Sequence, residues 1–148
     1  MSAPVLVDTN VFVYSRDSRN TSKQRRAHEW LEHLAEMRRG RVSAQVLHEY
    51  YVTVTRKLKP GLTVAEARAD LRALFHWLPS IEPRSLLQTA WTLQDGASLS
   101  FWDALVLGAA KLGRCGFVLS EDLPAGRRVA GIEVVSPFQV SPGQLTDP

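Results

Sequence analysis

Val5-Leu6-Val7-Asp8-Thr9-Asn10, close to the amino terminus, is the stretch of sequence that decides the fold. Three consecutive apolar residues followed by three polar ones are typical of a buried central strand that ends at an acid. Apolar character continues over residues 11–14, which we assign to the same buried segment. Ligands bind at the carboxyl ends of the strands in open parallel sheets. Asp8 is therefore a candidate site residue, and the structural alternative is an Asx-turn that closes the strand.

The rest of the chain alternates helical and strand-like patterns. The capping-box spacing of Thr21 and Gln24 predicts the start of a helix that ends at Gly40. Further elements are predicted as a brief strand over 41–43, helices over 44–58, 63–78, 84–94 and 101–112, and strands over 117–120 and 133–135. Strands separated by helices imply an α/β fold with a central parallel β-sheet and helices on both faces. We expect one domain over residues 1–140 and a loose tail over 141–148.

The size and composition are those of a single soluble globular domain. The 148 residues are 45% hydrophobic and 22% charged, the balance of a globular protein. No apolar run has the length of a membrane span, and the amino terminus lacks the pattern of a secretory signal, so we expect a cytoplasmic protein with no membrane partner. Cys115 is the only cysteine, which excludes an internal disulfide and a thiolate metal cage.

The positive charge is unevenly distributed. The net charge is +3, but residues 1–60 hold 11 of the 18 Lys and Arg against 6 of the 15 Asp and Glu. If several of the acids bind metal, the remaining surface is more basic than the total suggests. This distribution favours a polyanionic partner such as nucleic acid, although solvated helix ends would give the same pattern.

Three further acids occupy positions that suit a metal site. Glu49 borders an apolar helical stripe, Asp103 lies in the first turn of a late helix, and Asp122 follows the strand over 117–120. Each has a structural alternative: Glu49 as a rim residue, Asp103 as part of a capping box after Ser100, and Asp122 as a turn residue. Glu121 competes with its neighbour Asp122, because spacing alone does not choose between them.

A parallel sheet brings such strand exits and helix starts together at one edge. Mg²⁺ and Mn²⁺ prefer oxygen ligands, usually a few carboxylates together with water and substrate phosphate. A metal held in this way activates water and stabilises the charge that develops on a scissile phosphate. Zinc spacing, a phosphate-binding glycine loop and a nucleophile elbow are all missing from the sequence, so other chemistries have less support.

Four short motifs together resemble the PIN-domain family, and most closely its VapC toxins from bacterial and archaeal toxin-antitoxin pairs. They are Val5-Leu6-Val7-Asp8-Thr9-Asn10, Ser43-Ala44-Gln45-Val46-Leu47-His48-Glu49, Phe101-Trp102-Asp103-Ala104-Leu105 and Leu119-Ser120-Glu121-Asp122-Leu123. They occur in the family's order over nearly the whole chain. The resemblance implies that Asp8, Glu49, Asp103 and Asp122 are the catalytic, metal-binding acids. It also implies that Thr9, Asn10 and Ser120 orient them.

The same resemblance implies the activity and the partners. We expect a Mg²⁺- or Mn²⁺-dependent endoribonuclease that forms a homodimer and is inhibited by a cognate antitoxin. RNA should be held by cations near the acids, and we select Arg16, Lys23, Arg25, Arg26, Arg127 and Arg128. Two alternatives stay open: a non-catalytic RNA-binding or scaffold domain, and an aspartyl phosphohydrolase with Asp8 as its nucleophile. The latter expects an acid two residues later, where Asn10 stands.

Overall fold

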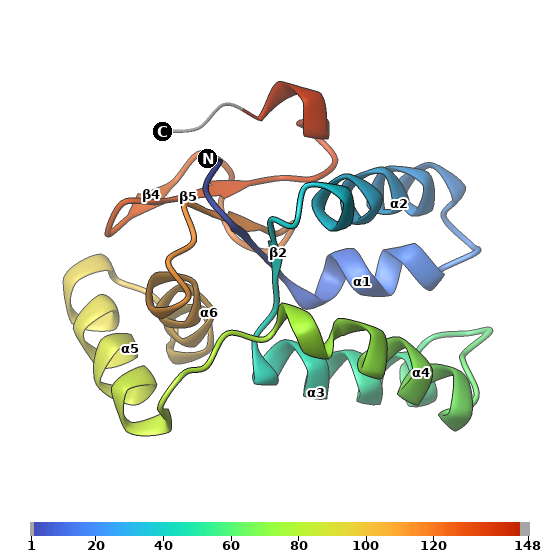
Figure 1. The fold of residues 1–148 in the computed structure, drawn as a ribbon, viewed down its shortest axis with the longest axis horizontal. Coiled ribbons are helices and arrows are strands. Elements are labelled where there is room, and N and C mark those ends of the chain that lie inside the picture. The colour runs from blue at the N-terminus through green and yellow to red at the C-terminus, as the bar shows by residue number, and fades with distance from the viewer. Residues whose placement is uncertain (1, 146–148) are drawn as a thin grey trace.

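The computed structural model describes residues 2–145 and places five strands in one sheet (Figure 1). The strands are β1 (Val5–Val7), β2 (Gly40–Arg41), β3 (Phe117–Leu119), β4 (Arg128–Val129) and β5 (Ile132–Val135), in the order β2-β1-β3-β5-β4. β1 lies between β2 and β3, and β3 pairs with β5; all three of these pairings are parallel. The predicted parallel central sheet is confirmed for these four strands.

The fifth strand, β4, which the sequence analysis did not predict, adds an antiparallel edge to the sheet. β4 pairs antiparallel with β5, with Arg128 opposite Glu133. The two strands are joined by Ala130 and Gly131, whose φ angles are +51° and +83°. Positive φ at both central residues is the requirement of a tight two-residue hairpin turn, and it reverses the chain at the sheet edge.

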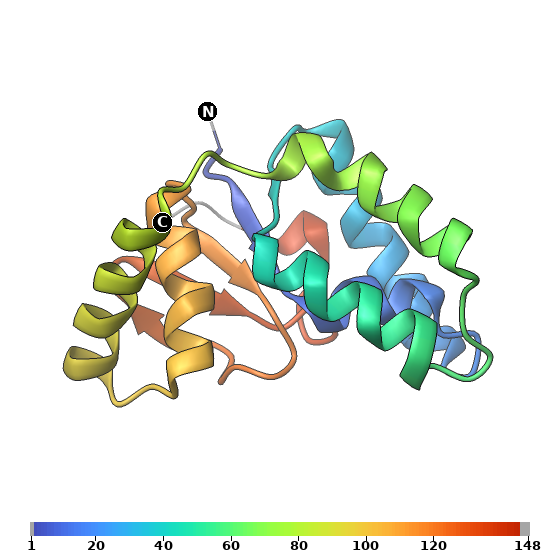
Figure 2. The ribbon, with the colours of Figure 1, turned by 90° about the horizontal axis from the view of Figure 1, so that it is seen from below.

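Helices cover both faces of the sheet, as predicted (Figures 1 and 2). Within the described residues they are α1 (Thr9–Arg16), α2 (Thr21–Glu36), α3 (Ala44–Val52), α4 (Val64–Leu74), α5 (Pro83–Ala97) and α6 (Phe101–Leu112). Successive strand residues point to opposite faces. Val5 and Val7 therefore join the buried core shared with α1 to α4, whereas Leu6 joins the core shared with α5 and α6.

Helix α1 replaces the continuous buried segment that we expected over residues 11–14. Asp8 has an extended backbone (φ −79°, ψ 162°), and its side chain accepts a hydrogen bond from the Thr9 backbone N–H, so that it caps a helix. Val11 and Phe12 are both buried on this helix. The apolar run alone suited strand and helix equally, and the capping Asp8 decides between them.

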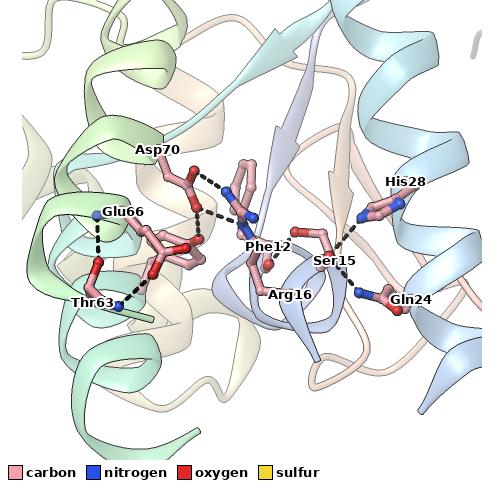
Figure 3. A network of polar contacts seen from close by, with 9 residues as sticks. Phe12, Ser15, Arg16, Gln24, His28, Thr63, Glu66 and Asp70 are labelled. Carbon is pink, nitrogen blue, oxygen red and sulfur yellow. Dashed lines mark hydrogen bonds and ion pairs between the residues drawn. The ribbon is translucent and has the colours of Figure 1, made fainter. Parts of the chain in front are cut away.

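The structure locates three helix boundaries that the sequence analysis predicted. The cap of α2 is Asn20 rather than Thr21, because the Asn20 side chain accepts from the Lys23 backbone N–H at 3.2 Å. The capping box of Thr63 and Glu66 is confirmed with both of its hydrogen bonds (Figure 3). Helix α3 continues into a wider π-helical turn, η1 (Thr53–Lys57), and the helical region ends before Pro60 as expected.

Two short 3-10 helices complete the described fold, η2 (Phe75–Trp77) and η3 (Pro142–Gln144). The indole Nε1 of Trp30 donates to the carbonyls of Pro137 and Val140 at 3.1 and 3.0 Å, which holds the segment before η3 against α2. Part of the expected tail, residues 146–148, lies outside the described residues. No helix within residues 2–145 is both long and apolar enough to cross a membrane.

Candidate active site

Asp8 lies at the carboxyl end of the central strand β1, and its residue is only 8% exposed. Its Oδ1 accepts from the Thr9 backbone N–H at 2.8 Å, and its Oδ2 accepts from Ser120 Oγ at 2.7 Å. Burial raises the pKa of Asp8, and the negative charges of Asp122 and Glu49 raise it further, while the two hydrogen bonds oppose the shift. The carboxylate is thus held in place in an environment that penalises its charge.

Ser120 is placed next to Asp8 by the pairing of the two central strands. Val7 pairs with Leu119, so the residues that follow each strand are neighbours at the sheet edge. Ser120 is fully buried, and its Oγ also accepts from the backbone N–H groups of Asp122 and Leu123, at 3.1 and 3.4 Å. One hydroxyl therefore orients Asp8 and fixes the backbone that carries Asp122.

Asn10 connects the two acids from the first turn of α1. Its Nδ2 lies within hydrogen-bond distance of Asp8 Oδ2 at 3.4 Å, Ser120 Oγ at 3.3 Å and Asp122 Oδ2 at 3.2 Å. Its Oδ1 accepts from the Glu121 backbone N–H at 3.1 Å. Both carboxylates converge on the N–H groups of one side-chain amide, and two negative charges held this close attract a cation.

Glu49 reaches the same edge from α3. Its Oε2 accepts from Thr9 Oγ1 at 2.7 Å, and its Oε1 accepts from Gln45 Nε2 at 2.8 Å. The residue is exposed, so the structural alternative of a rim position describes its burial correctly. It is nevertheless bonded to the residue beside Asp8, and its charge raises the pKa of Asp8.

Asp103 is the one predicted acid that the hydrogen bonds do not connect to the others. It occupies the first turn of α6, where its backbone N–H donates to Ser100 Oγ at 3.1 Å, and it is half-buried. Half of the capping box considered for this position is present, because Ser100 caps the helix while the Asp103 side chain makes no return bond to the Ser100 backbone in the described structure. In the described residues, the side chain of Asp103 makes no hydrogen bond to Asp8, Glu49 or Asp122.

The two neighbouring acids after β3 have different partners. The Glu121 carboxylate forms an ion pair with the Lys23 ammonium, which also lies over the rings of Tyr14 and Phe138, at 4.7 and 4.8 Å from their centroids. Asp122 instead accepts from Asn10 and raises the pKa of Asp8. The geometry favours Asp122 over Glu121 as the acid that faces Asp8.

The oxygen donors suit a hard cation, although they do not form a complete cage. Among residues 2–145, no group of three or more His, Cys, Asp or Glu side chains is gathered closely enough to hold a metal ion. Mg²⁺ commonly keeps several waters and uses only one or two carboxylates together with substrate phosphate. Asp8 and Asp122, which converge on Asn10, meet that smaller requirement.

A cavity of about 740 Å³ opens beside these acids. Its lining residues are Thr9, Asn10, Val13, Tyr14, Asp17, Arg19, His48, Glu49, Val52, Thr53, Lys57, Leu58, Glu121 and Asp122. Two of the proposed acids, Glu49 and Asp122, thus border a space large enough for part of an extended ligand.

A sequence profile shows the family of the chain. The PIN-domain family profile matches residues 5–128, most of the chain. The chain belongs to the PIN-domain family. PIN domains are in general nucleases. No curated protein matches the chain significantly in sequence.

Several solved structures share the PIN fold of this chain at low sequence identity. A toxin-antitoxin complex from Klebsiella pneumoniae has 18% identity and a TM-score of 0.62, over 92% of this chain and 99% of that one. FitAcB from Neisseria gonorrhoeae has 19% identity and a TM-score of 0.61, with the same coverages. VapBC2 from Rickettsia felis, bound to a promoter DNA fragment, has 17% identity and a TM-score of 0.57, over 88% and 96% of the two chains.

The cations selected from the sequence do not line the acidic cavity of this PIN domain. Arg16 forms an ion pair with Asp70 on α4, with Nε–Oδ2 3.0 Å and Nη2–Oδ1 2.5 Å, on the other side of α1 (Figure 3). The others lie as follows: Lys23 pairs with Glu121, Arg26 with Glu29 and Arg128 with Glu133, Arg127 donates to the Ala97 carbonyl, and Arg25 lines a hollow on α2.

Three basic residues that the sequence analysis did not select line the cavity instead: Arg19, His48 and Lys57. Sequence spacing held a signal for one of them. Glu49, Thr53 and Lys57 follow one another at intervals of four, which places them on one face of a continuous helical segment. That face is the wall of the cavity.

Proposed function

We propose that this PIN domain is a Mg²⁺- or Mn²⁺-dependent endoribonuclease that cleaves RNA phosphodiester bonds, and that it is the toxin of a toxin-antitoxin pair. Family membership supports nuclease chemistry, and the likeness to solved toxin-antitoxin complexes supports the toxin role. The observation that carries the proposal is the bonding of Asp8 and Asp122 to the same Asn10 amide at the edge of the central strands.

The proposed metal ligands are the four acids Asp8, Glu49, Asp103 and Asp122. Asp8 and Asp122 form the inner pair, because they share Asn10 and Ser120. Glu49, which is bonded to Thr9 beside Asp8, and Asp103 would complete the proposed set. A bound divalent ion would activate water and stabilise negative charge on the phosphate.

The chain's own residues have separate tasks in this proposal. Ser120 and the Thr9 N–H orient the carboxylate of Asp8, and Asn10 keeps Asp122 turned toward it. Thr9 holds Glu49 through its hydroxyl. Such hydrogen bonds behind the ligands fix their direction and commonly change metal affinity or activity by about 10- to 100-fold.

The likeness to toxin-antitoxin complexes supports a protein partner for this chain. The structure from Klebsiella pneumoniae is a toxin-antitoxin complex, and that from Rickettsia felis is VapBC2 bound to promoter DNA. We propose a cognate antitoxin as the partner of this chain, a homodimer as its assembly and the cytoplasm as its location. RNA remains the proposed substrate, and single-stranded segments are the usual targets of sequence-specific recognition.

The deciding experiment is RNA cleavage by the purified chain with Mg²⁺, with Mn²⁺ and with EDTA. We expect cleavage with either metal, none with EDTA, and a loss of at least about 100-fold in Asp8→Asn and Asp122→Asn. Asp95→Asn is the matched control, because Asp95 is an exposed acid on α5 outside the cavity, and it should cleave like the parent.

Metal binding separates the nuclease from a scaffold. Mn²⁺ titration followed by electron paramagnetic resonance should show a site in the parent and in Asp95→Asn that is weakened in Asp8→Asn. A folded parent that binds no Mn²⁺ and leaves RNA intact would identify a non-catalytic domain. Full cleavage by Asp8→Asn would remove the acid cluster from the mechanism.

A further inference from the structure

The cavity beside the acids has walls of both charges. Asp17, Glu49, Glu121 and Asp122 contribute carboxylates, whereas Arg19, His48 and Lys57 contribute basic groups. Two of these acids are already paired, Asp17 with Arg19 and Glu121 with Lys23. Glu49 and Lys57 lie on the same helical segment, eight residues apart, which corresponds to roughly 12 Å along a helix axis. The basic end of this wall is therefore well separated from the acid that would bind metal.

Lys57 is free to meet a ligand. It is exposed, it ends the π-helical turn η1, and it makes no ion pair with any residue from 2 to 145. The wider π-helical turn sets the direction of this residue, and such turns are frequent at functional sites. Among the described lining residues, Lys57 is the positively charged side chain that forms no ion pair.

The Arg19 side chain is positioned by hydrogen bonds to Asp17. The guanidinium Nε lies 3.0 Å from Asp17 Oδ1, and Nη2 lies 3.3 Å from Asp17 Oδ2, while the Arg19 side chain stays 59% exposed. A guanidinium has five N–H donors in a fixed plane, so most remain available after this pairing. Asp17 thereby fixes the position of the guanidinium and leaves several of its N–H groups available to a ligand.

We propose that Lys57 and Arg19 form a phosphate-binding subsite that holds single-stranded RNA next to the phosphate handled by the acids. This inference rests on the proposed ribonuclease function and names how that substrate is held. Carboxylates alone repel a polyanion, so a strand that enters the cavity needs cations to offset them. Val13, Tyr14 and Val52 line the same cavity and provide an apolar surface for ribose or base.

Binding measured without cleavage tests this subsite directly. Fluorescence anisotropy of a short labelled single-stranded RNA is followed in EDTA, at several KCl concentrations, with the full chain. We expect Lys57→Ala to weaken binding by about fivefold, the effect of one exposed charge contact. The slope of log K against log [KCl] should become shallower by about 0.7, the value for one lost phosphate contact on a single strand.

Lys59→Ala is the matched control, because Lys59 is also an exposed lysine of the same segment but does not line the cavity. It should keep the affinity and the salt slope of the parent, and Lys57→Arg should restore both. Under cleavage conditions, Lys57→Ala should raise KM and leave kcat within about twofold.

The two proposals fail in distinguishable ways. A parent that binds RNA with Lys57-dependent affinity but never cleaves it contradicts the nuclease and retains the subsite. A parent that cleaves RNA while Lys57→Ala matches it in affinity, salt slope and KM contradicts the subsite alone. A fall in kcat at unchanged KM in Lys57→Ala would also overturn it, since that result assigns Lys57 to the chemical step.

Discussion

Ser120 Oγ donates a 2.7 Å hydrogen bond to Asp8 Oδ2 between residues that are 112 positions apart in the sequence. The two residues meet because β1 and β3 are parallel neighbours and both strands end at the same edge of the sheet. The same oxygen accepts the Asp122 N–H, so the hydroxyl organises two of the proposed ligands. A buried group with this many partners is costly to remove.

Replacing Ser120 by alanine should lower kcat/KM for RNA by about 10- to 100-fold, because Asp8 loses its side-chain donor and Asp122 loses the acceptor of its backbone N–H. Steady-state cleavage assays check this, and a thermal melt establishes that the variant is folded. Ser80→Ala, an exposed serine, should behave like the parent. Unchanged kcat/KM in a folded Ser120→Ala would show that this hydrogen bond does not position the acids for catalysis.

The neighbouring acids Glu121 and Asp122 should respond differently to removal of their charge. Asp122→Asn should lose RNA cleavage, because Asp122 faces Asp8 through Asn10. Glu121→Gln should retain cleavage to within about tenfold, since its carboxylate is committed to Lys23. Each variant differs from the parent by one charge, so each controls for the other. The reverse order of activities would assign the fourth acid to Glu121.

Much of the acidic edge was predictable from local sequence. Asp8 and Asp122 each follow a short apolar strand, and a parallel sheet brings such strand exits together, so their neighbourhood depends only on topology. The role of Ser120 and Asn10 in orienting the acids came from the family resemblance rather than from local sequence, and both form hydrogen bonds with Asp8 and Asp122. The prediction that residues 11–14 continue the buried strand segment was wrong, because an apolar run does not distinguish a strand from the buried helix α1.

The cationic side of the cavity was less predictable because surface charge carries no direction in the sequence. Arg16 and Lys23 are close to Asp8 in the chain, yet each is paired with an acid from a distant element, Asp70 on α4 and Glu121 after β3. Such pairs depend on tertiary packing. The spacing of Glu49, Thr53 and Lys57 placed Lys57 on the same helical face as an expected acid, but spacing alone does not show that this face lines a cavity.

Asp70 should matter for stability rather than for RNA. It accepts the phenolic O–H of buried Tyr50 and pairs with Arg16, which joins α1, α3 and α4 (Figure 3). Asp70→Ala leaves the Tyr50 hydroxyl without its acceptor, and we expect the free energy of unfolding to fall by about 1–2 kcal/mol. The Arg16 pair adds little to this figure, because the Arg16 side chain is 42% exposed and screened by solvent.

Urea unfolding measures the stability change, and Asp95→Ala on α5 serves as the exposed control, with an expected change within about 0.5 kcal/mol. Arg16→Ala should bind single-stranded RNA like the parent, in contrast to Lys57→Ala. Weaker RNA binding by a fully folded Arg16→Ala would show that Arg16 contacts RNA, as the sequence analysis expected.

The charge of Asp8 should destabilise the metal-free protein at neutral pH. Burial, followed by the nearby carboxylates, raises the pKa of Asp8 above its ordinary value of 3.8, so the folded state binds this proton more tightly than the unfolded state. The stability contribution is therefore fully present below pH 3.8 and is lost as the pH rises through the folded-state pKa. Asp8→Asn, which keeps an acceptor oxygen and has no charge, should be more stable than the parent in EDTA, by a margin that widens with pH and then levels.

Urea unfolding at a series of pH values in EDTA gives this margin. Saturating Mn²⁺ should narrow the gap, because an ion that binds only the folded parent stabilises it by mass action and Asp8→Asn lacks the charge that attracts the ion. A margin that shrinks as pH rises has the opposite sign to the one argued here. Such a result would mean that Asp8 is stabilised as a carboxylate without metal, and it would remove the electrostatic reason for a cation at this edge of the sheet.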